Sequence, residues 1–241
     1  MKPRLLVLRS GPRPFTADLA PELDLMERAT HDFESLDPER PSGDFDVVIF
    51  TSAAGVERFL ARAELAARLS GPTAVHAVGP ATAEVLRRGG VANIREGGGS
   101  ARSLLEKLPA RLSGTRVLLP RGEDADDELP RGLALRGADV VPLTLYRKMA
   151  RPYDKALDDE IAVRPPAVFF ATSPSAARWF FEGASPPSVA LLRTTPAIAL
   201  GQPTEQALLS RGTRRVSIAR PPTFESAARL AVRLAAAGPP A

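Results

Sequence analysis

Cysteine is absent from this 241-residue chain, and histidine occurs only at His31 and His76. Without cysteine the chain can form no disulfide, thiolate nucleophile or cysteine-based metal site. The histidines lie far apart in strand-like segments, outside any zinc motif, and no G-x-S-x-G serine motif occurs. The missing residues therefore argue against zinc chemistry and against a Ser-His-Asp hydrolase, and the lack of cysteine fits a cytoplasmic protein.

Long hydrophobic runs are also absent, since the longest apolar segments have only the length of strands. The apolar run at the N-terminus stops at Arg9, which is too early for the hydrophobic region of a signal peptide. We therefore expect residues 4–9 to form a first β-strand, and we expect a cytoplasmic protein without a membrane partner.

Lysine is scarce, so arginine supplies most of the positive charge behind the formal net charge of +4. The arginines are spread along the chain instead of clustering, which argues against a nucleic-acid partner. Two interpretations of their number stay open. It reflects a bias of composition, or it provides guanidinium groups that bind carboxylates.

Motifs for cofactors and metals are missing as well. The chain contains no G-x-G-x-x-G, and the glycines at 97–99 lack the lysine of a P-loop, so we interpret them as a loop. The acidic residues at 122–128 precede an expected helix, where they complement the helix dipole. We therefore expect no cofactor and no metal.

What the chain does contain is a series of short runs rich in Val, Ile and Leu that alternate with helix-like segments. Such runs are typical of parallel strands that helices cover on both faces. Ser103 and Glu106 fit a capping box for a helix over 104–112. The expected strands are 4–9, 47–52, 74–79, 116–121, 139–146, 167–173, 196–201 and 215–219, with weaker ones at 32–36 and 92–96.

One sequence pattern occurs twice in the chain. Both "VVIFTSAAGVERFL" and "AVFFATSPSAARWFF" run from an apolar strand through Thr-Ser into a helix, and each is followed by a strand that ends in glycine. The N-terminal "RLLVLRSG" resembles "RVLLPRGE" and completes the second copy. We predict two similar α/β domains, one discontinuous (1–36 plus 153–241) and one inserted (44–146). Linkers at 37–43 and 147–152 would form a two-stranded hinge.

Candidate binding residues cluster where the expected strands end, which is where ligands bind in parallel sheets. Helix N-termini at these loops can hold anions, although the same hydroxyls also serve as helix caps. Tyr146 ends a strand at the predicted hinge, whereas Trp179 is interpreted as core packing. The candidates are Ser10, Gly11, Thr51, Ser52, Gly79, Thr82, Thr172, Ser173, Ser175, Gly201 and Thr204.

Several segments together resemble the uroporphyrinogen-III synthase family. They are "VVIFTSAAGVERF", "AVGPATAEVLRRGG", "RVLLPRGEDADDELPRGLALRGADVVPLTLYRK", "VFFATSPSAARWFF" and "ALGQPTEQALLSRG", in the right order over nearly the whole chain. The resemblance implies two flavodoxin-like domains joined by a two-stranded ladder, and a cytoplasmic enzyme without cofactor or metal.

The resemblance also implies the reaction. The substrate would be hydroxymethylbilane, a linear tetrapyrrole with eight acidic side chains, which the enzyme closes with loss of water and inversion of the last ring. Tyr146 matches the family's tyrosine and would hydrogen-bond to the leaving hydroxyl, while the strand-end residues above would bind carboxylates. We expect a monomer, because the sheets are already covered. Two alternatives stay open, a non-catalytic two-domain sensor and a degenerate paralogue of the synthase.

Overall fold

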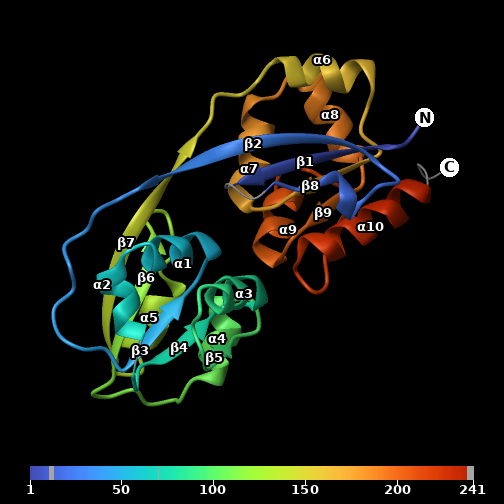
Figure 1. Ribbon diagram of the computed structural model, residues 1–241. Helices are drawn as coiled ribbons and strands as arrows, with labels where there is room; N and C mark the ends of the chain where they lie inside the picture. Colours follow the sequence, from blue (N-terminus) through green and yellow to red (C-terminus); the bar gives the residue numbers. More distant parts are fainter. Residues whose placement is uncertain (11–13, 70, 238–241) are drawn as a thin grey trace. The chain divides into compact units, whose positions relative to one another are not determined.

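The computed structural model describes residues 1–10, 14–69 and 71–237, and it divides them into two compact units. Unit 1 comprises Met1–Asp32 and Met149–Ala241, and unit 2 comprises Phe33–Lys148. Among the described residues, no helix combines the length and the apolar character that crossing a membrane would need. Each unit contains both helices and strands (Figure 1).

Unit 1 contains a largely parallel set of strands in the order β10-β9-β8-β1-β2. Helices α7 and α9 pack against each other beside this sheet, and α10 packs against β8 and β9 (Figure 1). Its elements are β1 (Arg4–Ser10), η1 (Ala17–Leu19), β2 (Asp24–Ser35), α6 (Ala156–Val163), β8 (Val168–Ala171), α7 (Pro174–Gly183), α8 (Pro186–Thr194), β9 (Ala197–Ala199), α9 (Gln202–Leu209), β10 (Val216–Ile218) and α10 (Phe224–Ala236).

The core of unit 1 lies on both faces of its strands. In β8, Phe169 belongs to the cluster under α6–α9, while the adjacent Phe170 belongs to the cluster under α10. This division follows from the alternation of side chains along a strand. Both rings are fully buried, and burial of each contributes about 2–3 kcal/mol to stability.

Unit 2 arranges its strands in the order β7-β6-β3-β4-β5, again with parallel pairing. One core cluster lies under α1 and α3 and another under α4 and α5. Its elements are β3 (Val47–Phe50), α1 (Ala53–Leu60), α2 (Ala63–Ala66), η2 (Ala67–Leu69), β4 (Ala74–Ala77), α3 (Pro80–Arg88), β5 (Ile94–Glu96), α4 (Ala101–Lys107), β6 (Arg116–Gly122), α5 (Glu128–Ala134) and β7 (Asp139–Ala150).

The expectation of separate sheets is wrong. The strands of the described residues form a single ten-stranded sheet, because β2 and β7 are neighbours in it. The two strands run antiparallel, as the bonds from Leu36 N to Leu145 O and from Arg151 N to Thr30 O require. Their backbone groups therefore pair with each other and continue the sheet.

Three elements differ from their expected boundaries by more than two residues. Strand β2 begins at Asp24 instead of residue 32, and β7 continues to Ala150 instead of ending at Tyr146. The helix expected over 104–112 is α4, which begins at Ala101 and ends at Lys107. Its capping box joins Ser100 to Ser103, because the chain enters the helix directly after the glycine loop at 97–99.

Candidate functional site

A cluster of hydroxyl groups lies at the carboxyl ends of β1 and β8 in unit 1. Ser10 Oγ is 2.7 Å from Ser173 Oγ, which in turn is 3.0 Å from Ser175 Oγ. The Ser10 backbone N–H donates to Thr172 Oγ1 at 3.1 Å. Four of the predicted binding residues therefore form one connected set, although Ser10 and Thr172 lie 162 positions apart in the chain.

The local sequence explains why the cluster is open to a ligand. Ser173 caps α7 by accepting the backbone N–H of Ala176 at 3.1 Å, and Pro174 stands in the first turn, where no intrahelical N–H is needed. Ser10 and Ser173 are half-buried, so they can still reach solvent. Neutral hydroxyl donors beside the N-terminus of a ten-residue helix favour an anionic group.

Unit 2 has a corresponding arrangement after β3. Ser52 caps α1 by accepting the Gly55 N–H at 3.1 Å, and its Oγ is also 2.9 Å from the hydroxyl of Tyr146. Thr51, the preceding residue, is half-buried. The structure therefore brings Ser52 and the candidate Tyr146 into direct contact, and the cap of one helix orients a phenol that is 94 positions away.

The ring of Tyr146 is enclosed by residues that the sequence did not single out. Phe33 meets it edge to face at 5.3 Å between centroids, and the guanidinium carbon of Arg58 lies 5.1 Å from the ring centre. A Cβ placed on Gly122 would come within 2.8 Å of the ring, so only glycine fits there without a shift. No local signal marks these residues, because their role arises from contacts across the fold.

The other tyrosine of the chain is in a different situation. The Tyr153 hydroxyl donates to the Asp158 carboxylate at 3.1 Å. Burial, followed by the charge of Asp158, raises the pKa of the Tyr153 phenol. This hydroxyl is therefore held protonated by a structural partner, whereas the only bond described for the hydroxyl of Tyr146 is to another hydroxyl.

In each unit a glycine stands between the next strand and the helix that follows it. Gly79 precedes α3 and Gly201 precedes α9, both with extended backbone, and Thr82 and Thr204 are buried in the first turn of the helix that follows. A Cβ on Gly79 would lie 3.1 Å from the Cα of Gly99, so the glycine loop at 97–99 approaches this helix start closely. The sequence pattern indicates a loop at 97–99 and does not predict this contact.

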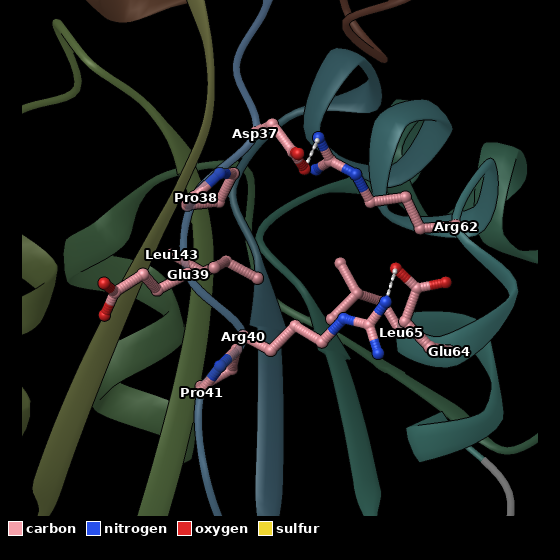
Figure 2. Close-up of a pocket in the computed structure, with 9 residues that line it drawn as sticks. All are labelled: Asp37, Pro38, Glu39, Arg40, Pro41, Arg62, Glu64, Leu65 and Leu143. Atoms are coloured by element: carbon pink, nitrogen blue, oxygen red, sulfur yellow. Dashed lines mark hydrogen bonds and ion pairs between the residues drawn. The ribbon is translucent and has the colours of Figure 1, made fainter.

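The described residues include two surface pockets, and none of the predicted site residues lines either pocket. One, of about 300 Å³, lies in unit 2 between residues 37–41 and α2, with ion pairs Asp37–Arg62 and Arg40–Glu64 across it (Figure 2). The other, of about 360 Å³, lies in unit 1 and includes Pro174, the residue after Ser173. Exposed Arg178 lines it and has no acidic partner within the described residues.

The predicted residues thus fall into local groups in each unit. Ser10, Thr172, Ser173 and Ser175 are joined in unit 1, and Ser52 and Tyr146 are joined in unit 2. Gly201 and Thr204 stand at the start of α9, and Gly79 and Thr82 at the start of α3. Gly11 lies outside the described residues. Trp179 packs on Tyr153 and donates its indole N–H to the Arg151 carbonyl, as its interpretation as core packing predicts.

The chain resembles crystal structures of uroporphyrinogen-III synthases in fold. For a mutant enzyme of Thermus thermophilus the TM-score is 0.67 at 20% identity, covering 97% of this chain and 98% of the other. For the enzyme of Helicobacter pylori 26695 the TM-score is 0.63 at 18% identity, covering 97% and 100%.

Comparisons of sequence give stronger evidence of the family than comparisons of fold. A protein of Methanothermobacter thermautotrophicus, provisionally named a uroporphyrinogen-III synthase, is 30% identical over 226 residues, which cover 90% of this chain and 88% of the relative. The family model of uroporphyrinogen-III synthase HemD matches residues 15–229. Since that match spans both units and includes Tyr146 and nearly all of the strand-end residues, the chain belongs to the uroporphyrinogen-III synthase family of lyase-type cyclising enzymes.

Proposed function

We propose that this protein cyclises hydroxymethylbilane to uroporphyrinogen III, with loss of water and inversion of the last pyrrole ring. The observation that carries the proposal is the family match over residues 15–229. The contact between Ser52 and Tyr146 supports it, because it provides a positioned proton donor, and the sequence has neither a cysteine nor the G-x-S-x-G motif of a serine nucleophile. Such a site suits a substrate that is itself reactive.

The chemistry asks little of the protein beyond positioning. Departure of the terminal hydroxyl, which takes up a proton and leaves as water, turns the end of the linear tetrapyrrole into an electrophilic azafulvene. The substituted carbon of the last ring attacks it to form a spiro intermediate, whose rearrangement inverts that ring. In the rearrangement the unsubstituted carbon of that ring makes the final bond and loses its proton, which replaces the one given to the leaving hydroxyl. Atoms and charge therefore balance without an oxidant, a reductant or a cofactor. The protein must hold the two ends of the substrate in this geometry.

Tyr146 would supply that proton. Ser52 Oγ accepts the N–H of Gly55, so it can direct its own proton toward the Tyr146 oxygen. The phenolic O–H is then free to point at the substrate's leaving hydroxyl. Removal of one such donor is expected to cost about tenfold to a thousandfold in rate.

The acidic side chains of the substrate would be bound by the strand-end residues of both units. In unit 1 the Ser10–Ser173–Ser175 hydroxyls offer donors, and Arg178, which lines the pocket at Pro174, offers a cation. The remaining proposed contacts are the hydroxyls of Thr51, Ser52, Thr82, Thr172 and Thr204 and the backbone N–H groups at the helix starts after Gly79 and Gly201.

The division of the chain into two flavodoxin-like domains is part of the same proposal. The order β2-β1-β8-β9-β10 corresponds to the flavodoxin-like order 2-1-3-4-5, and unit 2 has that order when it is read from β6. This supports two flavodoxin-like domains at 1–36 plus 153–241 and at 44–146, with linkers at 37–43 and 147–152. We also propose a cytoplasmic monomer that binds neither membrane nor nucleic acid.

The test uses freshly prepared hydroxymethylbilane. The products are oxidised, and the type I and type III isomers are separated and timed against a protein-free control. The proposal expects type III product to form faster than spontaneous closure yields type I. Type I product alone, at the spontaneous rate, would favour the non-catalytic sensor or a degenerate paralogue.

A further inference from the structure

Arg58, in the second turn of α1, places a positive charge against the candidate acid. Its guanidinium carbon lies 5.1 Å from the ring centre of Tyr146 and 5.2 Å from that of Phe33. The rings themselves meet edge to face. A guanidinium at this distance from an aromatic face is attracted by the ring quadrupole, so the three side chains form one packed cluster.

The charge of Arg58 is not neutralised by an acid. Its Nη1 donates to the Ala54 carbonyl at 3.1 Å and its Nη2 to the Phe33 carbonyl at 3.4 Å, and no ion pair involves it within the described residues. The Nε of Arg58 is buried, and it has no hydrogen-bond partner among the residues that the structure describes. An unpaired buried donor costs stability, so packing alone does not explain why a cation stands here.

We propose that Arg58 is a positioning residue that acts through Tyr146, an inference that rests on the proposed function. Its cation holds the ring where the phenol meets Ser52, 2.9 Å away. When Tyr146 passes its proton to the leaving hydroxyl, negative charge develops on the phenol oxygen and spreads into the ring. A fixed cation against that ring stabilises the charge as it forms, without contact with the substrate.

The experiment is a double-mutant cycle. Arg58→Met removes the charge and keeps much of the length, and Arg58→Lys keeps the charge. Each is made in the wild type and in Tyr146→Phe, which retains the ring without the hydroxyl. The matched control is Arg62→Met. Arg62 lies one turn later, is also half-buried and also donates to a backbone carbonyl, that of Leu36, but it faces the pocket of Figure 2 instead of Tyr146.

Arg58→Met should lower kcat on the order of tenfold to a hundredfold, with KM changed less than about threefold. Arg58→Lys should recover part of the loss, and Arg62→Met should leave kcat unchanged. In the Tyr146→Phe background, Arg58→Met should cost less than about twofold, because the hydroxyl it serves is gone. An equal loss of kcat in both backgrounds would show a merely structural role, and a rise in KM alone would show substrate binding; either result overturns the inference.

A second measurement separates this inference from the proposed function. The chain has only two tyrosines, so the ring signals of protein labelled with ¹³C-tyrosine can be assigned with Tyr146→Phe. Arg58→Met should shift the Tyr146 ring signal and leave that of Tyr153 in place, and Arg62→Met should move neither. An unmoved Tyr146 signal overturns the positioning role even if the wild type makes type III product. If the wild type makes only type I, the proposed function fails and the effect of Arg58 on proton transfer fails with it, whereas a shifted signal would still show that Arg58 positions the Tyr146 ring.

Discussion

Gly122 is the position at which a single methyl group should act on the candidate acid. A Cβ built there lies 2.8 Å from Cε2 and Cζ of Tyr146 and 3.1 Å from its hydroxyl oxygen. Ordinary contacts begin at 3.4 Å, so in Gly122→Ala the ring must retreat by at least about 0.6 Å. Directed away from Ser52, that shift would take the 2.9 Å hydrogen bond to the limit of a hydrogen bond.

The expected result is a loss of both stability and rate. Overpacking of this kind costs about 1–3 kcal/mol of unfolding free energy. A displaced acid should lower kcat by about tenfold to a hundredfold, no more than removal of the hydroxyl itself. The measurements are the rate of type III product formation and urea unfolding of the same preparation.

Gly183→Ala is the matched control, because Gly183 abuts the other tyrosine. A Cβ there would lie 2.5 Å from Cβ and Cγ of Tyr153, whose hydroxyl is bound to Asp158. This variant should lose comparable stability and keep the wild-type kcat. If Gly122→Ala keeps full activity while it loses stability, or if both variants lose activity alike, the position of the Tyr146 phenol does not govern the rate.

Four further outcomes are expected. Tyr146→Phe should lower kcat by about tenfold to a thousandfold in the isomer assay while circular dichroism reports an intact fold, and an undiminished rate would remove the phenol from the reaction. Arg178→Met should raise KM several-fold with kcat unchanged, since the Arg178 side chain offers only a cation for a substrate carboxylate. Initial rates over a range of substrate concentrations measure both constants, and an unaltered KM would contradict the prediction. Ser173→Ala removes the cap of α7 and should lower the unfolding free energy by about 1 kcal/mol in urea, with a higher KM; a capping role alone would leave KM in place. Burial, and then the charge of Arg95, lowers the pKa of His76 below 6.5, so the unfolded chain binds protons more readily than the folded chain. The contribution of neutral His76 to the unfolding free energy should be fully present above about pH 6.5 and should decline as the pH falls toward the lowered pKa. Urea unfolding of His76→Gln should show a smaller decline over that window.

The fold of each unit was largely predictable because its signals are local. Strand β8 is a continuous apolar run, and it is buried on both faces as such runs predict. Ser52 and Ser173 each stand one threonine after the end of a strand, where a hydroxyl can cap the next helix, and both do so. The duplicated pattern predicted two similar domains, and that stays a prediction.

What the sequence determined by itself is therefore the set of elements with strong neighbours in the chain, together with the hydroxyls and glycines at their ends. The tertiary structure alone decided how far β2 extends, since residues 24–31 become a strand by pairing with β1, in a register that runs from Arg4 opposite Asp24 to Ser10 opposite His31. It also decided what surrounds Tyr146. Ser52 and Arg58 belong to α1 and its cap, whereas Phe33 and Gly122 lie on two other segments. Contacts between distant segments leave no periodic or local trace in a single sequence.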